Sequence, residues 1–259
     1  MSKIRLIYKY FRHLLESKNT KGHGIHSPYL YRFTQNTIYE KNPFYVFQQI
    51  ETLRDHLKND DRWIEFKDFG TGFDRDVQVK TIAKKSLKRM VWAQLLFRIV
   101  NFTNAKNVLE LGTSLGLTSA YLASPSADIR CVTLEGSHSV AEIAKENFEK
   151  LALRNIAVEI GNIDAILVNV LTKMGTLDVV FIDANHQKKS VLNYFEQCIK
   201  HIHPETVFIL DDIYWSADME DAWKIIRKHE KVTATIDLFE MGIVFFNKSF
   251  PKKTFKMVL

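Results

Sequence analysis

Residues 107–123 read NVLELGTSLGLTSAYLA. An apolar run ends in a Gly-Thr-Ser-Leu-Gly turn and continues as a helical pattern of small residues, which is typical of a strand, a turn and a helix in succession. Three chemistries use a turn of this kind. It can present Ser114 as a nucleophile, bind the diphosphate of a dinucleotide, or hold a nucleoside that carries no phosphate. The rest of the sequence has to distinguish these options.

After Lys106, short apolar runs alternate with helical patterns. This alternation predicts an α/β fold, a Rossmann-like doubly wound and mostly parallel sheet of seven strands. The last two strands are joined too tightly for a crossover, so they should form an antiparallel hairpin at one edge. We expect the strands at residues 107–111, 130–135, 156–160, 177–183, 206–211, about 232–239 and 242–247.

The first part of the chain reads as a helical appendage, residues 1–85, in front of a ligand-binding domain, residues 86–259. Its first helix is amphipathic, and Ser27-Pro28 is typical of a helix start. Residues 68–72, DFGTG, look like a second ligand turn, but the strand before them alternates instead of running buried, so we interpret them as an ordinary turn. We expect the appendage to act as a lid or as the contact of a homodimer.

The charge is unevenly distributed. Residues 1–100 contain 19 Lys and Arg against 10 Asp and Glu, and the remainder contains 17 against 20. A basic front leaves nucleic-acid binding open as an alternative to a solvated helical surface. The two cysteines, Cys131 and Cys198, form no paired motif, which favours the reducing cytoplasm. No apolar stretch approaches the ~20 residues of a membrane span.

Carboxylates lie at or just beyond the end of almost every predicted strand. The residues concerned are Glu110, Glu135, Asp164, Asp183, Asp211 and Asp212. In open parallel sheets, ligands bind at the carboxyl ends of the strands. Because unpaired buried carboxylates are costly, acids gathered at this edge indicate a ligand that carries positive charge or donates hydrogen bonds.

Two of the three options for the glycine turn fit poorly. A serine hydrolase using Ser114 lacks a His-Gly oxyanion stretch before the strand, and Glu110 would place negative charge near the oxyanion. A dinucleotide site needs Gly-x-Gly-x-x-Gly, whereas Ser114 occupies the position of the middle glycine. The hydrolase remains the weaker alternative.

S-adenosylmethionine (SAM) fits the acids better, because it has a cationic sulfonium, a ribose and an adenine but no phosphate. Gly112 and Gly116 would allow the backbone to approach it closely. Glu135 could accept hydrogen bonds from both ribose hydroxyls. The adenine would lie near residues 162–164, which follow the third strand.

The stretch ELGTSLGLTS, residues 110–119, resembles the first motif of class I SAM-dependent methyltransferases, in the form used by small-molecule O-methyltransferases of the catechol O-methyltransferase type. The similarity extends over roughly residues 80–247. It implies in-line methyl transfer from SAM to a small-molecule acceptor, at oxygen. The cofactor-binding residues implied are Glu110, Gly112, Thr113, Ser114, Gly116, Glu135, Gly136, Asn162, Ile163, Asp164 and Asp183.

In this family the fourth strand ends in a metal-binding aspartate followed by a catalytic lysine, and the fifth ends in Asp-Asn. Here the corresponding positions hold Asp183, His186 and Asp211-Asp212. The resemblance therefore implies that Asp183, Asp211 and Asp212 bind Mg²⁺ or another divalent cation, which prefers oxygen ligands. His186 suits a general base at neutral pH, with Asp183 beside it. Alternatively, His186 or one of the paired aspartates caps the helix that follows it.

Overall fold

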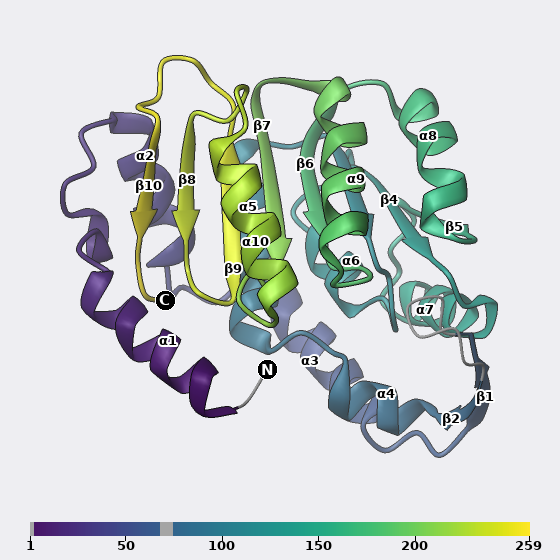
Figure 1. Ribbon diagram of the computed structural model, residues 1–259. Coiled ribbons are helices and arrows are strands. Elements are labelled where there is room, and N and C mark those ends of the chain that lie inside the picture. The colour runs from purple at the N-terminus through teal and green to yellow at the C-terminus, as the bar shows by residue number, and fades with distance from the viewer. Residues whose placement is uncertain (1–2, 68–74) are drawn as a thin grey trace. The chain divides into compact units, whose positions relative to one another are not determined.

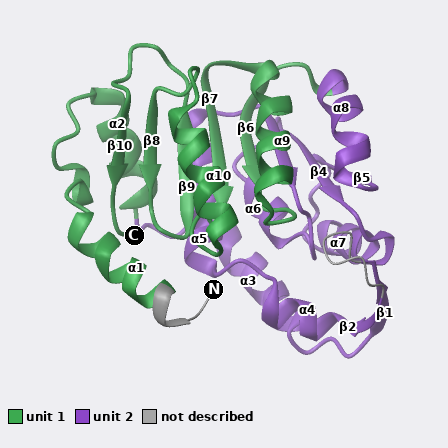
Figure 2. Ribbon diagram, viewed as in Figure 1, with its two compact units in different colours: residues 1–40, 174–259 green, residues 41–173 purple. Residues whose placement is uncertain are grey.

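The computed structural model describes residues 3–67 and 75–259, so the turn at residues 68–72 lies outside the described residues. The chain forms two compact units (Figure 2). Unit 1 consists of Met1–Glu40 and Met174–Leu259, and unit 2 consists of Lys41–Lys173. The division of the chain into an appendage and a domain at residue 85 stays a prediction.

Unit 2 contains three parallel strands of the main sheet, in the order β3-β4-β5, and a separate antiparallel hairpin, β1-β2 (Figure 1). The strands are β1 (Trp63–Phe66), β2 (Arg75–Gln78), β3 (Asn107–Leu111), β4 (Arg130–Glu135) and β5 (Ile156–Ile160). The helices are α3 (Tyr45–Leu57), α4 (Val79–Lys85), α5 (Met90–Thr103), α6 (Leu117–Ala123), α7 (His138–Lys150) and α8 (Ile163–Met174).

The core of unit 2 joins the helix after the glycine turn to the helices that precede β3. The ring of Phe47, on α3, lies 4.9 Å from the ring of Phe97 on α5 and 5.4 Å from that of Tyr121 on α6. Burying such large side chains stabilises the unit by roughly 1.5–3 kcal/mol each. Helix α3 therefore supports α6 directly.

Unit 1 contains five strands of the main sheet, in the order β10-β8-β9-β7-β6 (Figure 1). They are β6 (Leu177–Ile182), β7 (Ile202–Asp211), β8 (Ala234–Asp237), β9 (Met241–Phe245) and β10 (Lys253–Lys256). The helices are α1 (Lys3–Glu16), α2 (Pro28–Phe33), α9 (Lys188–Cys198) and α10 (Ala217–Lys228). Short helical turns occur at Thr20–Gly22, Thr34–Ile38 and Ile199–His201.

The main sheet has eight strands in the described part of the chain, not the expected seven. The antiparallel pair β8 and β9 is confirmed, but β10 adds a further strand, parallel to β8, on the outside of that pair. Its sequence, KTFK, buries only Phe255 fully between lysines. Charged residues are common on edge strands, and so short a pattern gives no period from which a strand can be predicted.

Helices cover both faces of the strands in unit 1, as expected for a doubly wound sheet. A Cβ added at Gly242, on β9, would lie 2.7 Å from the ring of Trp223 on α10. Phe245 packs edge-on against Phe33 of α2, with ring centroids 5.0 Å apart. Residues 242 and 245 face opposite sides of a strand. The helix start at Ser27 is also confirmed, because its hydroxyl accepts from Leu30 N at 3.4 Å.

None of the helices within residues 3–67 and 75–259 combines the length and the apolar character needed to cross a membrane.

Candidate functional site

The carboxyl ends of the three strands in unit 2 are joined by backbone hydrogen bonds. Gly112 N, directly after β3, donates to Leu134 O at 3.0 Å, and Gly161 N, directly after β5, donates to Glu135 O at 2.9 Å. The loops after β3, β4 and β5 therefore meet at one edge of the unit. These loops, together with the strand and helix residues next to them, contain every predicted cofactor residue except Asp183.

The glycine turn alternates left-handed residues with ordinary ones. The φ angles are 105° at Gly112, 49° at Ser114 and 79° at Gly116. A left-handed conformation costs a residue other than glycine roughly 1–2 kcal/mol. Ser114 adopts it, and its backbone N–H donates to Glu135 Oε2 at 2.8 Å. This hydrogen bond links the turn to the end of β4 and offsets the strain.

Glu135 is held by backbone amides from two different loops. Ser114 N donates to one carboxylate oxygen, and Ser137 N donates to the other at 2.9 Å. Burial raises the pKa of Glu135 above its usual range, while the amides of Ser137, Ser114 and Gly136 oppose this shift. The side chain is thus fixed in position, and its carboxylate is poorly hydrated. Such a group gains from any ligand that donates hydrogen bonds to it.

Glu110 is fully buried. Its Oε2 accepts from the hydroxyl of Ser119, on α6, and from Thr133 Oγ1 at 2.7 Å. The Thr133 hydroxyl also lies 2.7 Å from Thr113 Oγ1, in the turn. This network favours a positioning role for Glu110 and Thr113, which attach the turn to β4. Their direct contact with a cofactor stays a prediction.

Gly116 is required for helix packing. A Cβ at this position would lie 2.7 Å from two ring atoms of Phe148 and 3.0 Å from Ala144 Cβ, both on α7. The neighbour observed is a helix of the same unit, and close approach of the Gly116 backbone to a ligand stays a prediction. The glycine lets α6 begin against α7.

The predicted adenine region begins helix α8. Asn162 Oδ1 accepts from Asp164 N at 3.0 Å, so the asparagine caps the helix. Ile163 is buried, while Asn162 and Asp164 are exposed. The cap leaves the amide group of Asn162 oriented by the backbone, which is compatible with the predicted contact to a base but does not require one.

In unit 1, the loop after β6 brings Asp183 and His186 together. His186 Nε2 lies 3.5 Å from Asp183 Oδ1. Asn185 and His186 both have left-handed backbones, with φ of 63° and 37°. Asn185 Nδ2 donates to Tyr194 OH at 2.5 Å, which ties the loop to α9. Two consecutive strained residues at a strand end are typical of a functional loop.

The capping alternatives for these residues are not supported. The N-cap position of α9 is Gln187, one residue after His186. The N-cap of α10 is Ser216, whose hydroxyl accepts from Met219 N at 3.1 Å, so neither Asp211 nor Asp212 has this role. Because His186 does not cap α9, its predicted role as a general base stays open.

The three aspartates do not form a metal-binding group. Asp211 is the last residue of β7 and is buried, whereas Asp212 is half-buried with a left-handed backbone. Within the described residues, no group of three or more His, Cys, Asp or Glu side chains is arranged to hold a metal ion. The site implied for Mg²⁺ at Asp183, Asp211 and Asp212 therefore stays a prediction.

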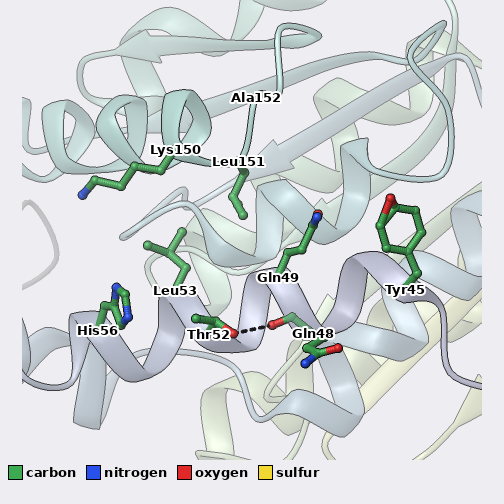
Figure 3. Close-up of a pocket in the computed structure, with 9 residues that line it drawn as sticks. All are labelled: Tyr45, Gln48, Gln49, Thr52, Leu53, His56, Lys150, Leu151 and Ala152. Carbon is green, nitrogen blue, oxygen red and sulfur yellow. Dashed lines mark hydrogen bonds between the residues drawn. The ribbon is translucent and has the colours of Figure 1, made fainter.

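An open groove of about 710 Å³ lies elsewhere on unit 2, between α3 and the end of α7 (Figure 3). Gln48, Thr52 and His56 line it from α3, and Lys150 and Leu151 line it from the other side. None of the predicted site residues lines this groove. It is therefore separate from the strand ends that carry the candidate cofactor residues.

Several residues that hold the site were missed from the sequence. Thr133 and Ser119 bind Glu110, and the Ser137 amide binds Glu135. One signal was available, because Thr133 is a polar residue inside the buried strand CVTL. A hydroxyl in such a strand needs a buried partner, and Glu110 is that partner.

Comparison with known proteins identifies relatives of this chain. A family model described as O-methyltransferase matches residues 75–249. The O-methyltransferase imqG of Aspergillus flavus is 33% identical over 114 residues, which are 42% of this chain and 45% of that protein. The catechol O-methyltransferase of Niastella koreensis is 28% identical over 118 residues, 44% of this chain and 52% of that protein. The matches thus span about half the length of these curated relatives.

A solved structure shows the same fold. The O-methyltransferase TomG of Streptomyces achromogenes, which is involved in tomaymycin synthesis and was crystallised in complex with SAM, superposes with a TM-score of 0.59 at 17% identity. The match covers 83% of this chain and 97% of TomG. Because the family model covers more than half of the sequence, including β3 to β9 and the glycine turn, this chain belongs to the O-methyltransferase family.

Proposed function

We propose that this protein is a SAM-dependent methyltransferase that transfers the methyl group to an oxygen of a small-molecule acceptor. Family membership supports the reaction class, and the relatives named for O-methylation support oxygen as the acceptor atom. The complex of TomG with SAM supports the cofactor.

The observation that carries the proposal is the position of Glu135. Its two carboxylate oxygens accept from amides of the loops after β3 and β4, so the side chain is fixed before any ligand arrives. A preorganised carboxylate with poor hydration suits the two vicinal hydroxyls of a ribose, which can donate to it as a pair. It would not suit a phosphate, which carries the same sign of charge.

The reaction is an in-line displacement. The bond between the methyl carbon and sulfur breaks, a bond between the carbon and the acceptor oxygen forms, and the sulfur leaves as neutral S-adenosylhomocysteine (SAH). The acceptor loses its hydroxyl proton, which needs a base within hydrogen-bonding reach. We assign this proton to His186.

The loop after β6 supports one ring nitrogen of His186 as the base. Asp183 Oδ1 lies 3.5 Å from His186 Nε2, so an N–H on Nε2 faces the carboxylate. The Nδ1 lone pair then accepts the proton, and Asp183 stabilises the imidazolium that results. Asp183 is a positioning residue in this assignment, and the metal ligands implied by the resemblance have no step in it.

The test measures SAH binding by calorimetry. Glu135→Gln keeps the size of the side chain but removes its charge and one acceptor, and it should weaken SAH binding by about 1.5–3 kcal/mol, the usual value for hydrogen bonds to charged groups. Glu142→Gln, on the exposed side of α7, is the matched control and should leave the affinity unchanged. Failure of the wild-type protein to bind SAH would contradict the proposal.

Two alternatives remain testable by simple means. A nucleic-acid substrate would be recognised by the basic first 100 residues, and retention on RNA or DNA should then fall steeply with salt. A serine hydrolase would react with a fluorophosphonate probe at Ser114. The amide of Ser114 already positions Glu135, and a carboxylate beside the nucleophile would oppose an oxyanion, which favours methyl transfer.

A further inference from the structure

Helix α1 packs on unit 1 through its charged side. Lys9 pairs with Glu220 of α10, and Glu16 pairs with Lys256 of β10. Between them His13 is almost fully buried, with Nε2 2.9 Å from Met257 O and Nδ1 3.5 Å from Asp237 Oδ1. Residues 9, 13 and 16 lie on one face of a helix. Three polar contacts along that face fix the rotation of α1 about its axis.

The opposite side of α1 is apolar and exposed. Phe11 is 62% exposed and Leu15 is 82% exposed, and Ile7, Tyr8 and Leu14 are also exposed. Residues 7, 11, 14 and 15 recur at helical spacing and form one continuous stripe. A surface helix of a globular protein normally buries such a stripe in the core. In α1 the arrangement is inverted.

Exposed cations lie beside this apolar stripe and beyond its end. Residues 1–21 contain six Lys and Arg against a single Glu. Arg12 is exposed beside the stripe, and Lys18 and Lys21 are exposed in the segment that follows the helix. An apolar helical face with cations around it and Phe, Tyr and Leu at its centre is the composition of helices that lie in a membrane interface.

We propose that α1 docks unit 1 onto an anionic membrane surface, with Phe11, Leu15 and their neighbours on the stripe inserted at the boundary between headgroups and acyl chains. The helix lies on the bilayer and does not cross it. The apolar side chains supply the insertion, and the surrounding cations select anionic lipid.

A second copy of the chain is the less suitable occupant. The 14 residues of α1 form a helix ~21 Å long, and one face ~10 Å wide offers roughly 200 Å². A stable dimer buries about 800 Å² on each partner. A two-fold contact through α1 would also bring two strongly basic segments together, whereas an anionic surface attracts them.

The experiment is co-sedimentation of the full-length protein with vesicles. Wild-type protein should bind equimolar phosphatidylcholine and phosphatidylserine, bind phosphatidylcholine alone much more weakly, and dissociate as salt rises. The double variant Phe11→Ser, Leu15→Ser should lose at least about tenfold in vesicle affinity, because two inserted side chains become polar. Ile225→Ser, at an exposed apolar residue of α10, is the matched control and should bind like the wild type.

A charge variant provides a second test that does not depend on the apolar residues. Lys18→Gln together with Lys21→Gln should weaken binding to the anionic vesicles by about fivefold per lysine. Far-ultraviolet circular dichroism and SAH binding check that all variants fold. Light scattering of the free protein measures its oligomeric state.

The proposal would be overturned if the wild-type protein did not bind anionic vesicles, or if it bound neutral vesicles equally well. A wild-type dimer that Phe11→Ser, Leu15→Ser converts to a monomer, without vesicle binding by either protein, would identify α1 as a dimer contact instead.

Discussion

Two loops of this molecule follow buried parallel strands and contain left-handed backbone conformations, but they place different kinds of residue there. The loop after β3, in unit 2, places glycines at two of its three left-handed positions, and its third, Ser114, donates a backbone hydrogen bond to Glu135. The loop after β6, in unit 1, places Asn185 and His186 in left-handed conformations without any glycine. The glycines of the first loop adopt its backbone shape at low cost. The second loop holds two side chains, including that of His186, in a strained backbone conformation.

The difference suggests that the first loop positions the cofactor site and that the second supplies the reacting side chain. The side chains of the first loop, and the acids beside it, mostly bind one another, as Glu110 does with Thr133. In the second loop, His186 Nε2 lies 3.5 Å from Asp183 Oδ1, which is longer than a usual hydrogen bond. Strain of roughly 1–3 kcal/mol at such a residue persists where function depends on it. Variants in the two loops should therefore fail in different ways.

The largest effect is expected in the second loop. His186→Ala should reduce kcat by about 10²–10⁴-fold, the usual contribution of a positioned general base, and leave SAH affinity unchanged. Steady-state kinetics and calorimetry measure the two quantities. His201→Ala, in the short turn before β7, is the matched histidine control. Equal losses in both variants would remove His186 from the mechanism.

A glycine pair isolates the contribution of packing in the first loop. Gly116 and Gly175 have nearly the same φ, 79° and 76°. An added Cβ at Gly116 would meet Phe148, whereas one at Gly175 would have no atom of the described residues within 4 Å apart from those of its two chain neighbours. Gly175→Ala should cost ~1–2 kcal/mol for its backbone. Gly116→Ala should cost a further ~1–3 kcal/mol for overpacking.

Urea denaturation of both glycine variants measures the free energy of unfolding. The difference between them gives the packing contribution, because the backbone cost is shared. Equal destabilisation would show that Phe148 moves aside without cost.

The pH dependence of SAH binding tests the role of Glu135 beside the first loop, and a smaller effect is expected. Burial raises the pKa of Glu135, so it becomes protonated at a higher pH than an ordinary glutamate and then loses an acceptor for the ribose. Affinity should fall as the pH decreases through this pKa, by up to about tenfold per pH unit. Calorimetry over a pH series should show this decline in the wild type and a flat profile in Glu135→Gln.

The same group acts on the stability of the fold with the opposite sign. Because its folded pKa is raised, the folded protein takes up the proton more readily than the unfolded chain. The contribution of Glu135 to stability is therefore present at low pH and is lost as the pH rises through its folded pKa. Weaker binding at low pH would thus not reflect unfolding caused by this residue.

The smallest effect is expected from chelation. The proposed mechanism removes the proton of the acceptor with His186 and uses no metal, so treatment with EDTA should change neither SAH affinity nor kcat. Dialysis against EDTA followed by addition of Mg²⁺ provides the comparison. A loss of activity that Mg²⁺ restores would show that the aspartates converge when substrate is bound.

Much of the fold could be predicted because it depends on local patterns. The runs VLEL and CVTLE are mostly apolar, with Glu110 and Thr133 as the buried polar exceptions, and β3 and β4 occupy the predicted residues 107–111 and 130–135. The turn and its left-handed glycines also follow from the sequence, since few other residues adopt that conformation at low cost. The strand β10 was missed because four residues with a lysine at each end carry little periodic information.

The site could be predicted only in part. The sequence identified Glu135 as an important acid, but the two amides that fix it come from Ser114, 21 residues earlier, and from Ser137. Likewise, Glu110 was recognised by its place before the turn, while its burial depends on hydroxyls of β4 and α6. Such contacts join segments that are distant in the sequence, so no regular residue spacing in the sequence reveals them.

Helix α1 shows both what the sequence determines by itself and what depends on the tertiary structure. The sequence by itself determined that α1 is amphipathic and basic, that a strand, a glycine turn and a helix follow one another, and that acids stand at the strand ends. Only the tertiary structure decided that the charged side of α1 faces unit 1 and that Glu110 is buried. The physical reason is that periodicity fixes which side chains share a face, whereas the partner of each face is chosen by the free energy of contacts with distant segments.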